Sequence, residues 1–544
     1  MYLESIDFNQ LPFSKLFQTY IQNFQKVTNF YNGNPLNEEE IGSYYKKFQF
    51  KGDREKIVEL IKQFNEPYDL DGRALQNIEK LKDENTVTIV TGQQLGVYGG
   101  PLYTIYKAMT AIAWARKLEE KTGKNVVPVF WMADEDHDYE EIAAVNFPNR
   151  NAVNFPNRNE VHTCILSGFD NNKKPVSDLV IPENFKSFRD EIKENLRETD
   201  FSADLWNMLD ECYQPGITFR KAFGTLISRI FSKHGMILAG SNDKKIKDYL
   251  ADTIVRSIEN ASEIGERLNQ KSESLANEFH QQAQTDSSLL FLMEEDRRNR
   301  ISFESGKWNN SGNHEWSSEE LLQLVEKQPD RFSPNVFLRP ILQDKLLPNA
   351  AYVAGPGELA YYGQMKGLYK IFDLEMPFII PRLSATLIES SITRVMKELP
   401  FQFSDYNQRI EDLESRYVEQ ANTMDVNAFF NEWKKEVAKL SEQKSEEIKE
   451  IDPTLKGAAE KATSSYYHTL DALKGKVFRA IKQQNDIQLK RIRKIHMNLF
   501  PERELQERKV SFIYYMNKYG LDIWDQILEN LENETAYSHK VIYL

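Results

Sequence analysis

The sequence predicts an α/β fold with parallel strands, and two observations carry this prediction. Residues 87–131 pass from a short β-branched apolar run through a glycine-rich turn and a helix-spaced segment into a second apolar run. A strand-like run, a Gly-Pro turn and a helix-spaced segment recur at residues 351–370. Both stretches are typical of the βαβ unit, in which ligands bind outside the carboxyl ends of the strands.

The first of these units supplies two loops at one edge of the predicted sheet. We expect a strand over 87–90, a helix over 102–118 and a second strand over 126–131. The loops 91–101 and 134–138 follow these two strands. Because the strands are parallel, we expect both loops to face one crevice.

Further elements extend this pattern along the chain. Residues 1–80 are predicted to be mostly helical and to cap the core. We expect additional core strands over 236–239, 351–354 and 378–380, and a hairpin-bearing insert over 288–303. The new strands would bring their own loops to the same crevice.

Composition limits the classes of function open to the chain. It has 544 residues, a net charge of −13 and a pI near 5.4, which suits a large enzyme but not a general nucleic-acid binder, since that needs a net basic face. No run approaches the roughly 18 apolar residues of a membrane helix and no signal-peptide pattern is present, so we expect a soluble, cytoplasmic protein without a membrane partner. Cys164 and Cys212 lie far apart without metal-site or disulfide spacing, so no zinc site is predicted.

The loop after the first strand, from Thr91 to Pro101, is a candidate binding element. Its glycines let the backbone approach a ligand, and a proline at the first position of a helix suits an amino end that attracts an anion. The spacing matches neither the Walker loop nor the GxGxxG fingerprint, so a purely structural turn is the alternative, for the glycines as for the two glutamines. The candidates for substrate or phosphate binding are Thr91, Gly92, Gln93, Gln94, Gly99, Gly100, Pro101 and Tyr103.

The second loop, from Asp134 to Asp138, concentrates carboxylates around one histidine. Nearby negative charge favours the imidazolium and burial opposes it, which suits His137 for general acid or base work. Consecutive residues at a strand end point alternately, so convergence on a metal is not expected; a solvated acidic loop is the alternative. We take His137, Asp136 and Glu135 as catalytic candidates and Asp138 as a binding candidate.

A third group of candidates belongs to the second βα unit. Arginine side chains near the start of a helix would add positive charge to an anion site. The binding candidates are Arg339, Gly355, Glu358, Tyr362, Gln364 and Arg382, and Asn242 joins them from the loop after the 236–239 strand. No Gly-x-Ser-x-Gly motif or Cys/His pair argues for nucleophilic covalent catalysis.

The segment from 391 to 501 is charged and helical. An apolar stripe with three-four spacing covers 426–448, Pro453 breaks it, and a second stripe over 455–495 predicts one long helix. Two such helices fit an antiparallel coiled-coil arm. Its stripes are buried either in a homodimer or within an intrachain hairpin alone.

A short tandem repeat lies outside these elements. Residues 145–151, VNFPNRN, recur at 153–159. Two copies of this length cannot stack into a repeat fold, so we expect a local duplication in a surface loop.

Five stretches together make the sequence recognisable. They are TGQQLGVYGGPLYTIYKA, PVFWMADEDHDYEEI, GMILAGSND, NVFLRPILQDKLLPNAAYVAGPGELAYYGQ and IPRLSATLIE. In this order the chain resembles the bacillithiol biosynthesis cysteine-adding enzyme family (BshC), the cysteine ligases, over nearly its whole length. The resemblance implies a Rossmann-like core with connecting inserts, similar in plan to class I aminoacyl-tRNA synthetases and other nucleotidylyl transferases, and a long antiparallel helical coiled coil that makes a homodimer.

Together the patterns and the resemblance imply a division of the chain into five parts. These are the first half of the Rossmann-like core with its helical cap (1–160), insert regions with a core strand near 236–243 (161–330), the second half of the core (331–390), the coiled-coil arm (391–501) and a helical segment that docks on the core (502–544).

The activity implied by the family is the last step of bacillithiol synthesis, which joins the carboxyl group of cysteine to the amine of glucosaminyl-malate. Amide formation from a free carboxylate normally needs ATP, so ATP or ADP is the expected ligand, with Mg²⁺ only as its companion. The synthetase plan places a two-histidine element where Gly99–Tyr103 stands here, so that chemistry is not carried over. His137 is then the candidate acid-base group.

Two other functions fit the same residues. One is a nucleotidylyl or sugar transferase that uses the same crevice on a sugar substrate. The other is a non-catalytic coiled-coil adaptor whose core only binds a nucleotide.

Overall fold

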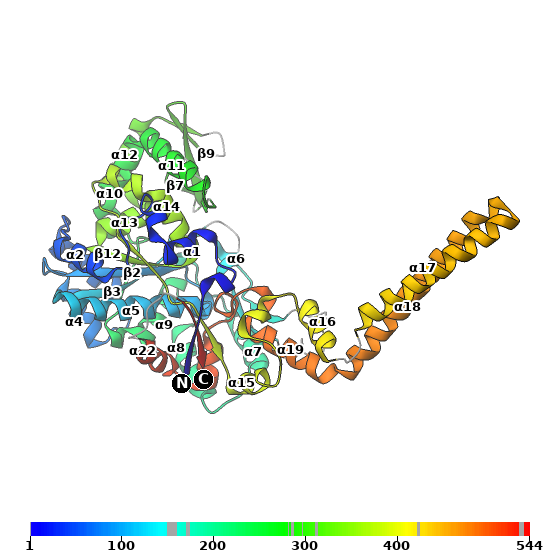
Figure 1. The fold of residues 1–544 in the computed structure, drawn as a ribbon. Helices are drawn as coiled ribbons and strands as arrows, with labels where there is room; N and C mark the ends of the chain where they lie inside the picture. Colours follow the sequence, from blue (N-terminus) through cyan, green and yellow to red (C-terminus); the bar gives the residue numbers. More distant parts are fainter. Residues whose placement is uncertain are drawn as a thin grey trace. The chain divides into compact units, whose positions relative to one another are not determined.

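The computed structural model describes residues 2–149, 160–169, 174–280, 282–283, 288–295, 297–310, 314–421, 425–531 and 538–544 (Figure 1). The chain divides into two compact units. The core unit contains residues 1–147, 162–386 and 506–542, and the arm unit contains 148–161, 387–505 and 543–544. The finer division into five parts stays a prediction.

A five-stranded parallel sheet forms the centre of the core unit. Its strands are β2 (Val87–Gln93), β3 (Val126–Met132), β6 (Ile237–Ala239), β12 (Asn349–Ala354) and β13 (Phe378–Pro381). They lie in the order β13-β12-β2-β3-β6, and all neighbouring pairs are parallel. Nearly every residue of these strands is buried, as expected for a parallel sheet covered on both faces. The predicted core strands are confirmed.

The strand order determines where a ligand can bind. The chain runs from β2 through β3 to β6 on one side and then crosses to β12 and β13 on the other. This is the doubly wound order, with its topological switch point between β2 and β12. The carboxyl ends of these two strands therefore mark the crevice predicted from the sequence.

Two helices follow the strands at the switch point. Helix α5 (Leu102–Thr122) packs on β2 and β3 and ends at Gly123, whose φ of 68° is left-handed. Helix α14 (Pro356–Tyr369) begins with a proline at its first turn, where the missing N–H costs nothing. Both predicted helices are confirmed. Other helices of the core unit include α1 (Lys15–Gln22), α2 (Glu38–Lys47), α3 (Arg54–Asn65), α4 (Gly72–Lys80), α9 (Phe219–Phe231), α10 (Lys244–Glu259) and α11 (Ala261–Ala276).

The insert forms a second, antiparallel sheet. Its strands are β7 (Leu290–Glu294), β8 (Arg297–Glu304), β9 (Lys307–Asn310), β10 (Glu315–Trp316) and β11 (Phe332–Pro334), in the order β10-β9-β8-β7-β11. The predicted hairpin is the pair β7 and β8, which are antiparallel.

Both ends of the chain contribute strands that the sequence did not predict. Strand β1 (Tyr2–Ile6) and strand β15 (His539–Tyr543) join β14 (Ala385–Ile388) in the order β1-β15-β14. The prediction of a mostly helical segment over 1–80 and a helical segment over 502–544 missed these two five-residue strands. Such strands gain their stability from partners distant in sequence, which local patterns do not reveal.

The arm unit contains the predicted helical hairpin. Helices α17 (Val426–Ile451) and α18 (Lys456–Gln484) lie side by side along their length (Figure 1). Val426, Phe430 and Leu470 form its buried cluster, against which Trp433, Val477, Phe478 and Ile481 pack. The prediction of one helix through residue 495 is wrong, because α18 ends at Asn485 (φ −100°, ψ 11°) before α19 (Asp486–Leu499) begins.

The structure describes only part of the tandem repeat. Of the tandem repeat, residues 150–159 lie outside the described residues, and the first copy begins within β4 (Ala144–Pro148). Among the described helices, none is both long and apolar enough to cross a membrane.

Candidate active site

A cavity of about 610 Å³ lies at the carboxyl edge of the central sheet. All five strands contribute to its lining, through Gly92 and Gln93 of β2, Ala133–Asp136 after β3, Ser241 after β6, Gly355–Glu358 after β12 and Arg382 after β13. Phe291, Arg298, Arg300 and Pro334 come from the insert sheet. The cavity therefore occupies the switch point, where doubly wound folds bind their ligands.

The lining carries more positive than negative charge, although the whole chain is acidic. Its basic residues are Lys107, Arg298, Arg300, Arg339, Arg382 and Arg508, and its acidic residues are Asp134, Glu135, Asp136 and Glu358. A local excess of guanidinium groups on an acidic protein is suited to an anionic ligand.

A buried ion pair crosses the switch point. The Nζ of Lys107, on α5, lies 2.5 Å from the Oε2 of Glu358, on α14. The same ammonium donates to the Gly92 carbonyl oxygen at 2.7 Å and to the Gln93 Oε1 at 2.9 Å. Lys107 therefore holds the end of β2 against the start of α14.

Glu358 is anchored at both carboxylate oxygens. Its Oε2 accepts from the Gly355 N–H at 2.8 Å, and its Oε1 accepts from the Tyr352 hydroxyl at 2.6 Å. Burial raises the pKa of Glu358, but the Lys107 ammonium and these hydrogen bonds outweigh it, so its pKa lies below the ordinary value. Glu358 is therefore ionised, and both of its carboxylate oxygens are bonded to other residues of the protein.

Arg339 lies on α13 (Leu338–Leu346) and is ordered by aromatic neighbours. Its guanidinium donates to the Tyr361 hydroxyl at 2.8 Å and to Gln343 Oε1 at 3.1 Å, and lies 5.4 Å from the centre of the Tyr352 ring. Both hydrogen-bond partners are uncharged, so these contacts do not neutralise the positive charge of the guanidinium. Arg339 therefore lines the cavity with a positively charged group whose position is fixed by its neighbours.

Arg382 connects the cavity to the C-terminal segment. Its guanidinium donates to Glu507 Oε1 at 2.7 Å and lies 5.6 Å from the centre of the Tyr103 ring. Glu507 also accepts from the Ser384 hydroxyl at 2.9 Å and from the Ala385 N–H at 2.8 Å. Both charged side chains are almost fully buried, so this pair fixes the loop after β13.

Two adjacent carboxylates follow β3 in the cavity lining. Asp134 Oδ1 accepts from the Ser241 and Asn242 N–H groups, each at 3.1 Å. Burial, with Glu135 nearby, raises the pKa of Asp134 to about 7. Within the described part of the chain neither carboxylate oxygen of Glu135 has a hydrogen-bond partner, although Lys247 Nζ lies 3.4 Å away.

The remainder of the acidic loop is tied to Gln94 and Arg298. Asp136 Oδ2 accepts from Gln94 Nε2 at 2.7 Å. Arg298 donates to His137 Nδ1 at 2.8 Å, to Ser333 Oγ at 2.9 Å and to the Pro334 carbonyl oxygen at 2.6 Å. Because guanidinium has only donors, the imidazole accepts at Nδ1 and its neutral form carries its proton on Nε2.

The structure brings about half of the predicted residues into the cavity. Those that line it are Gly92, Gln93, Gln94, Tyr103, Glu135, Asp136, Arg339, Gly355, Glu358 and Arg382. The others are not among the described residues that line it. Their roles in binding or catalysis stay predictions.

Gly99, Gly100 and Pro101 pack against the C-terminal segment. The Leu102 N–H donates to the Val510 carbonyl oxygen at 2.9 Å, and the Ser511 hydroxyl donates to the Gly100 carbonyl oxygen at 3.1 Å. A Cβ at Gly99 would lie 2.3 Å from the Phe512 ring. These contacts give the glycines a packing role, and they cover the amino end of α5.

The remaining candidates make internal contacts. Thr91 donates to the Val353 carbonyl oxygen at 3.1 Å, and Gln364 donates to the Ser272 hydroxyl at 2.7 Å. Tyr362 stacks on Tyr361 with ring centres 5.2 Å apart. Asn242 donates to Ser177 Oγ at 2.7 Å, and Asp138 caps α6 (Tyr139–Ile142) through the Glu141 N–H at 3.3 Å.

Sequence reasoning missed five charged residues of the cavity lining, Lys107, Asp134, Arg298, Arg300 and Arg508. Lys107 belongs to the TIYKA segment of α5. An apolar residue would be expected at this position, where the helix faces the sheet. A lysine in a buried helix face is a usable indication, because it must find a partner. Arg298 and Arg508 reach the cavity from distant segments, and no local pattern marks them.

Protein-family models match the chain in two adjacent parts. Residues 1–383 match the N-terminal Rossmann-like domain of bacillithiol biosynthesis BshC, and residues 385–544 match its C-terminal coiled-coil domain. These matches confirm the predicted fold class.

Relatives in several bacteria carry the name "Putative cysteine ligase BshC". The protein of Salinibacter ruber is 33% identical over 97% of this chain and 96% of its own length. That of Chlorobaculum tepidum is 30% identical over 98% and 97%, and that of Bacillus cereus strain ATCC 14579 is 29% identical over 88% of both chains. The chain therefore belongs to the bacillithiol biosynthesis BshC family.

Proposed function

We propose that this chain is a cysteine ligase of bacillithiol biosynthesis that forms an amide between the carboxyl group of cysteine and the amine of glucosaminyl-malate. The name shared by the relatives supports a cysteine ligase. The observation that carries the proposal is the cavity at the switch point, whose walls combine ordered cations with a carboxylate that lacks a hydrogen-bond partner among the described residues.

The cations of the cavity suit the anionic groups of these substrates. Cysteine and the malate part of the acceptor carry carboxylates, and Arg339 and Arg382 present guanidinium groups held by neighbouring residues. Charge-assisted hydrogen bonds to carboxylates are among the strongest that proteins form. Lys107 contributes positive charge behind them while paired with Glu358.

Amide formation requires activation of the cysteine carboxyl group, and ATP is the proposed source. The same arginines fit phosphate oxygens. The amino end of α5 does not suit this task, because its first N–H already donates to Val510. Phosphate binding is therefore assigned to the side chains of the cavity rather than to the glycine-rich turn.

The attacking amine must lose a proton, and Glu135 is the proposed acceptor. Glu135 is among the residues that line the cavity, and its carboxylate has no hydrogen-bond partner within the described residues, although the Lys247 ammonium lies 3.4 Å away. His137 does not suit this task, because Arg298 occupies its Nδ1. With its proton on Nε2, the neutral imidazole cannot accept a proton there, and His137 is not among the described residues that line the cavity.

The arm unit is proposed to form a homodimer. The buried cluster of the hairpin covers only its base, while Leu440, Leu455, Tyr466 and Leu473 along α17, α18 and their turn are exposed. A second copy would cover these side chains. Sedimentation velocity at micromolar concentration should give about twice the chain mass, and a monomer would contradict this part of the proposal.

Product analysis tests the proposed reaction directly. The full chain is incubated with cysteine, glucosaminyl-malate, ATP and Mg²⁺, and the mixture is analysed by mass spectrometry. A condensation product of cysteine and glucosaminyl-malate is expected. A nucleotidylated sugar would instead indicate a transferase, and the absence of any product would indicate a nucleotide-binding adaptor.

A further inference from the structure

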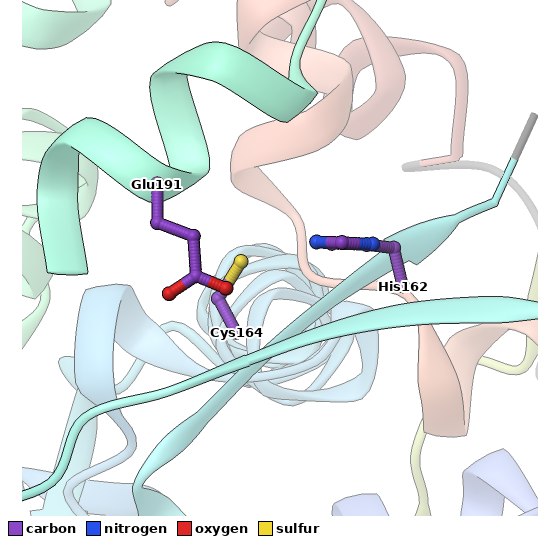
Figure 2. A group of neighbouring side chains, drawn as sticks. All are labelled: His162, Cys164 and Glu191. Carbon is purple, nitrogen blue, oxygen red and sulfur yellow. The ribbon is translucent and has the colours of Figure 1, made fainter.

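A second group of reactive side chains lies between strand β5 (Val161–Ile165) and helix α7 (Phe185–Asn195) of the core unit. It consists of His162, Cys164 and Glu191 (Figure 2). An imidazole nitrogen, the Cys164 Sγ and a carboxylate oxygen of Glu191 all lie within 4.8 Å of one another. None of the three is among the described residues that line the cavity.

The local fold explains why these side chains converge. His162 and Cys164 are two positions apart on a strand, so their side chains project from the same face. Figure 2 shows that both point towards the helix that carries Glu191. That helix is held in place by its buried residues Phe185, Phe188 and Ile192.

One buried polar atom of this group lacks a hydrogen-bond partner among the described residues. Cys164 is 0% exposed, and the Nε2 of His162 is buried without a hydrogen-bond partner among the described residues. Burial, together with the charge and hydrogen bond of Glu191, raises the pKa of the Cys164 thiol to about 12. Buried polar atoms are normally paired, so an imidazole nitrogen without a partner among the described residues, beside a thiol and a carboxylate, is suited to bind a cation.

We propose that His162, Cys164 and Glu191 bind a zinc ion, with a water molecule as the fourth ligand. Sulfur, imidazole nitrogen and carboxylate oxygen are the ligand types that zinc prefers, whereas Mg²⁺ and Ca²⁺ prefer oxygen alone. Tetrahedral bonds of roughly 2.0–2.3 Å place ligand atoms about 3.3–3.8 Å apart. The exposed Glu191 side chain can make the required movement of about 1 Å.

Zinc binding would displace the thiol proton to solvent and leave a metal thiolate. Glu191 lies at the exposed side of the group, which gives the ion a path of entry. The site follows from the fold and not from a sequence motif, since its third ligand comes from a helix beyond the strand. This is why the two cysteines alone gave no indication of it.

The proposed ion would brace a helix that supports the active-site turn. Phe185 and Phe188 of α7 pack on Tyr98, with ring centres 5.6 Å and 6.1 Å away. Tyr98 belongs to the turn that follows Gln94, and Gln94 lines the cavity. The role assigned to zinc is therefore structural, and it is independent of the ligase reaction.

Metal titration of the full chain without a histidine tag tests this proposal. Protein stripped with a chelator is titrated with ZnCl₂ by calorimetry, and bound zinc is counted by mass spectrometry after desalting. One zinc per chain and a raised Tm are expected. Replacement with Co²⁺ should give a thiolate-to-cobalt charge-transfer band that Cys164→Ser abolishes.

Substitution identifies the ligands. Loss of an outer-shell partner costs roughly 10–100-fold in metal affinity, so Cys164→Ser and Glu191→Gln should each weaken zinc binding by at least about 100-fold. Cys212→Ser removes the other buried cysteine and should leave binding unchanged. Glu191→Gln changes an exposed residue, so it serves as the decisive variant if Cys164→Ser does not fold. No bound zinc, or equal affinity in Glu191→Gln and the original chain, would overturn the proposal.

Discussion

The ammonium of Lys107 lies 2.5 Å from the carboxylate of Glu358 and joins the two halves of the doubly wound sheet. Lys107 belongs to the helix after β2, and Glu358 to the helix after β12. Their strands flank the topological switch point. The two similar βα patterns in the sequence thus meet at one ion pair, which borders the cavity assigned to the reaction.

Breaking this pair is expected to destabilise the fold and impair the reaction. Glu358→Gln keeps an acceptor oxygen for only one of the Tyr352 and Gly355 donors, places an amide NH2 group at the other oxygen position, and leaves the Lys107 ammonium without a counter-ion. Removal of one partner from a buried pair costs about 3–5 kcal/mol. Urea denaturation should show a loss of this size in the free energy of unfolding.

The exposed ion pairs of Glu38 provide the matched control. Glu38 contacts Lys117 at 2.7 Å and Lys121 at 2.9 Å, with 44% of its own side chain exposed. Exposed pairs contribute roughly 0–1 kcal/mol, so Glu38→Gln should change stability little. Equal losses in the two variants would contradict the role given to Glu358.

The packing role of the glycine-rich turn predicts a large cost for Gly99→Ala. Gly99 has a φ of +83°, and an added Cβ would lie 2.3 Å from the Phe512 ring. Left-handed strain of roughly 1–2 kcal/mol adds to overpacking of about 1–3 kcal/mol. We expect a lower Tm and a loss of about 2–5 kcal/mol in unfolding free energy.

Gly123→Ala separates the two effects. Gly123 also has a positive φ, of +68°, but its added Cβ would meet nothing within 4 Å. Only the strain of roughly 1–2 kcal/mol should remain. If Gly99→Ala were no worse than Gly123→Ala, the contact with Phe512 would not support the turn.

The raised pKa of Asp134 predicts a pH-dependent loss of stability. In the folded chain its pKa is about 7, above its ordinary value of 3.8, so the folded state keeps a proton that the unfolded state releases. Stability therefore falls as pH rises from about 4 to 7 and then levels off. Between pH 5 and pH 8 this contribution amounts to about 3 kcal/mol.

Asp134→Asn should remove this contribution. Its side-chain oxygen can still accept from the Ser241 and Asn242 N–H groups. The difference in unfolding free energy between pH 5 and pH 8 should shrink by about 3 kcal/mol relative to the original chain. The same pH dependence in both proteins would show that Asp134 ionises normally in the fold.

The assignment of Glu135 predicts a selective effect on turnover. Glu135→Gln retains size and polarity but cannot take a proton, so kcat should fall by roughly 10²–10⁴-fold with little change in KM. Glu140→Gln, at an exposed position after the same loop, should turn over normally. An unchanged kcat in Glu135→Gln, or a similar loss in both variants, would remove Glu135 from the reaction.

The sequence predicted the central sheet well, for a physical reason. Parallel strands are buried on both faces, so β2, β3 and β12 read as short apolar runs, and glycine-containing turns follow β2 and β12. Strands β1 and β15 escaped prediction, because they are short and depend on each other from opposite ends of the chain. Helix α18 was predicted too long, because the apolar spacing continues across Asn485.

Prediction of the site was limited in a similar way. Residues that follow the strand ends, such as Gln93 and Glu358, could be placed at the crevice because parallel topology brings strand ends together. The direction of a side chain could not be deduced. Gly99 packs against the Phe512 ring, and Arg298 reaches the site from the insert sheet. Both positions depend on tertiary contacts.

The dependence of product formation on the cavity tests the central claim most directly. Condensation of cysteine with glucosaminyl-malate in the presence of ATP is followed by mass spectrometry for the original chain and for Lys107→Met, with folding of the variant checked by circular dichroism. The account predicts the amide product from the original chain and a loss of at least about 100-fold in rate from the folded variant. No amide from the original chain, or an equal rate from Lys107→Met, would contradict it.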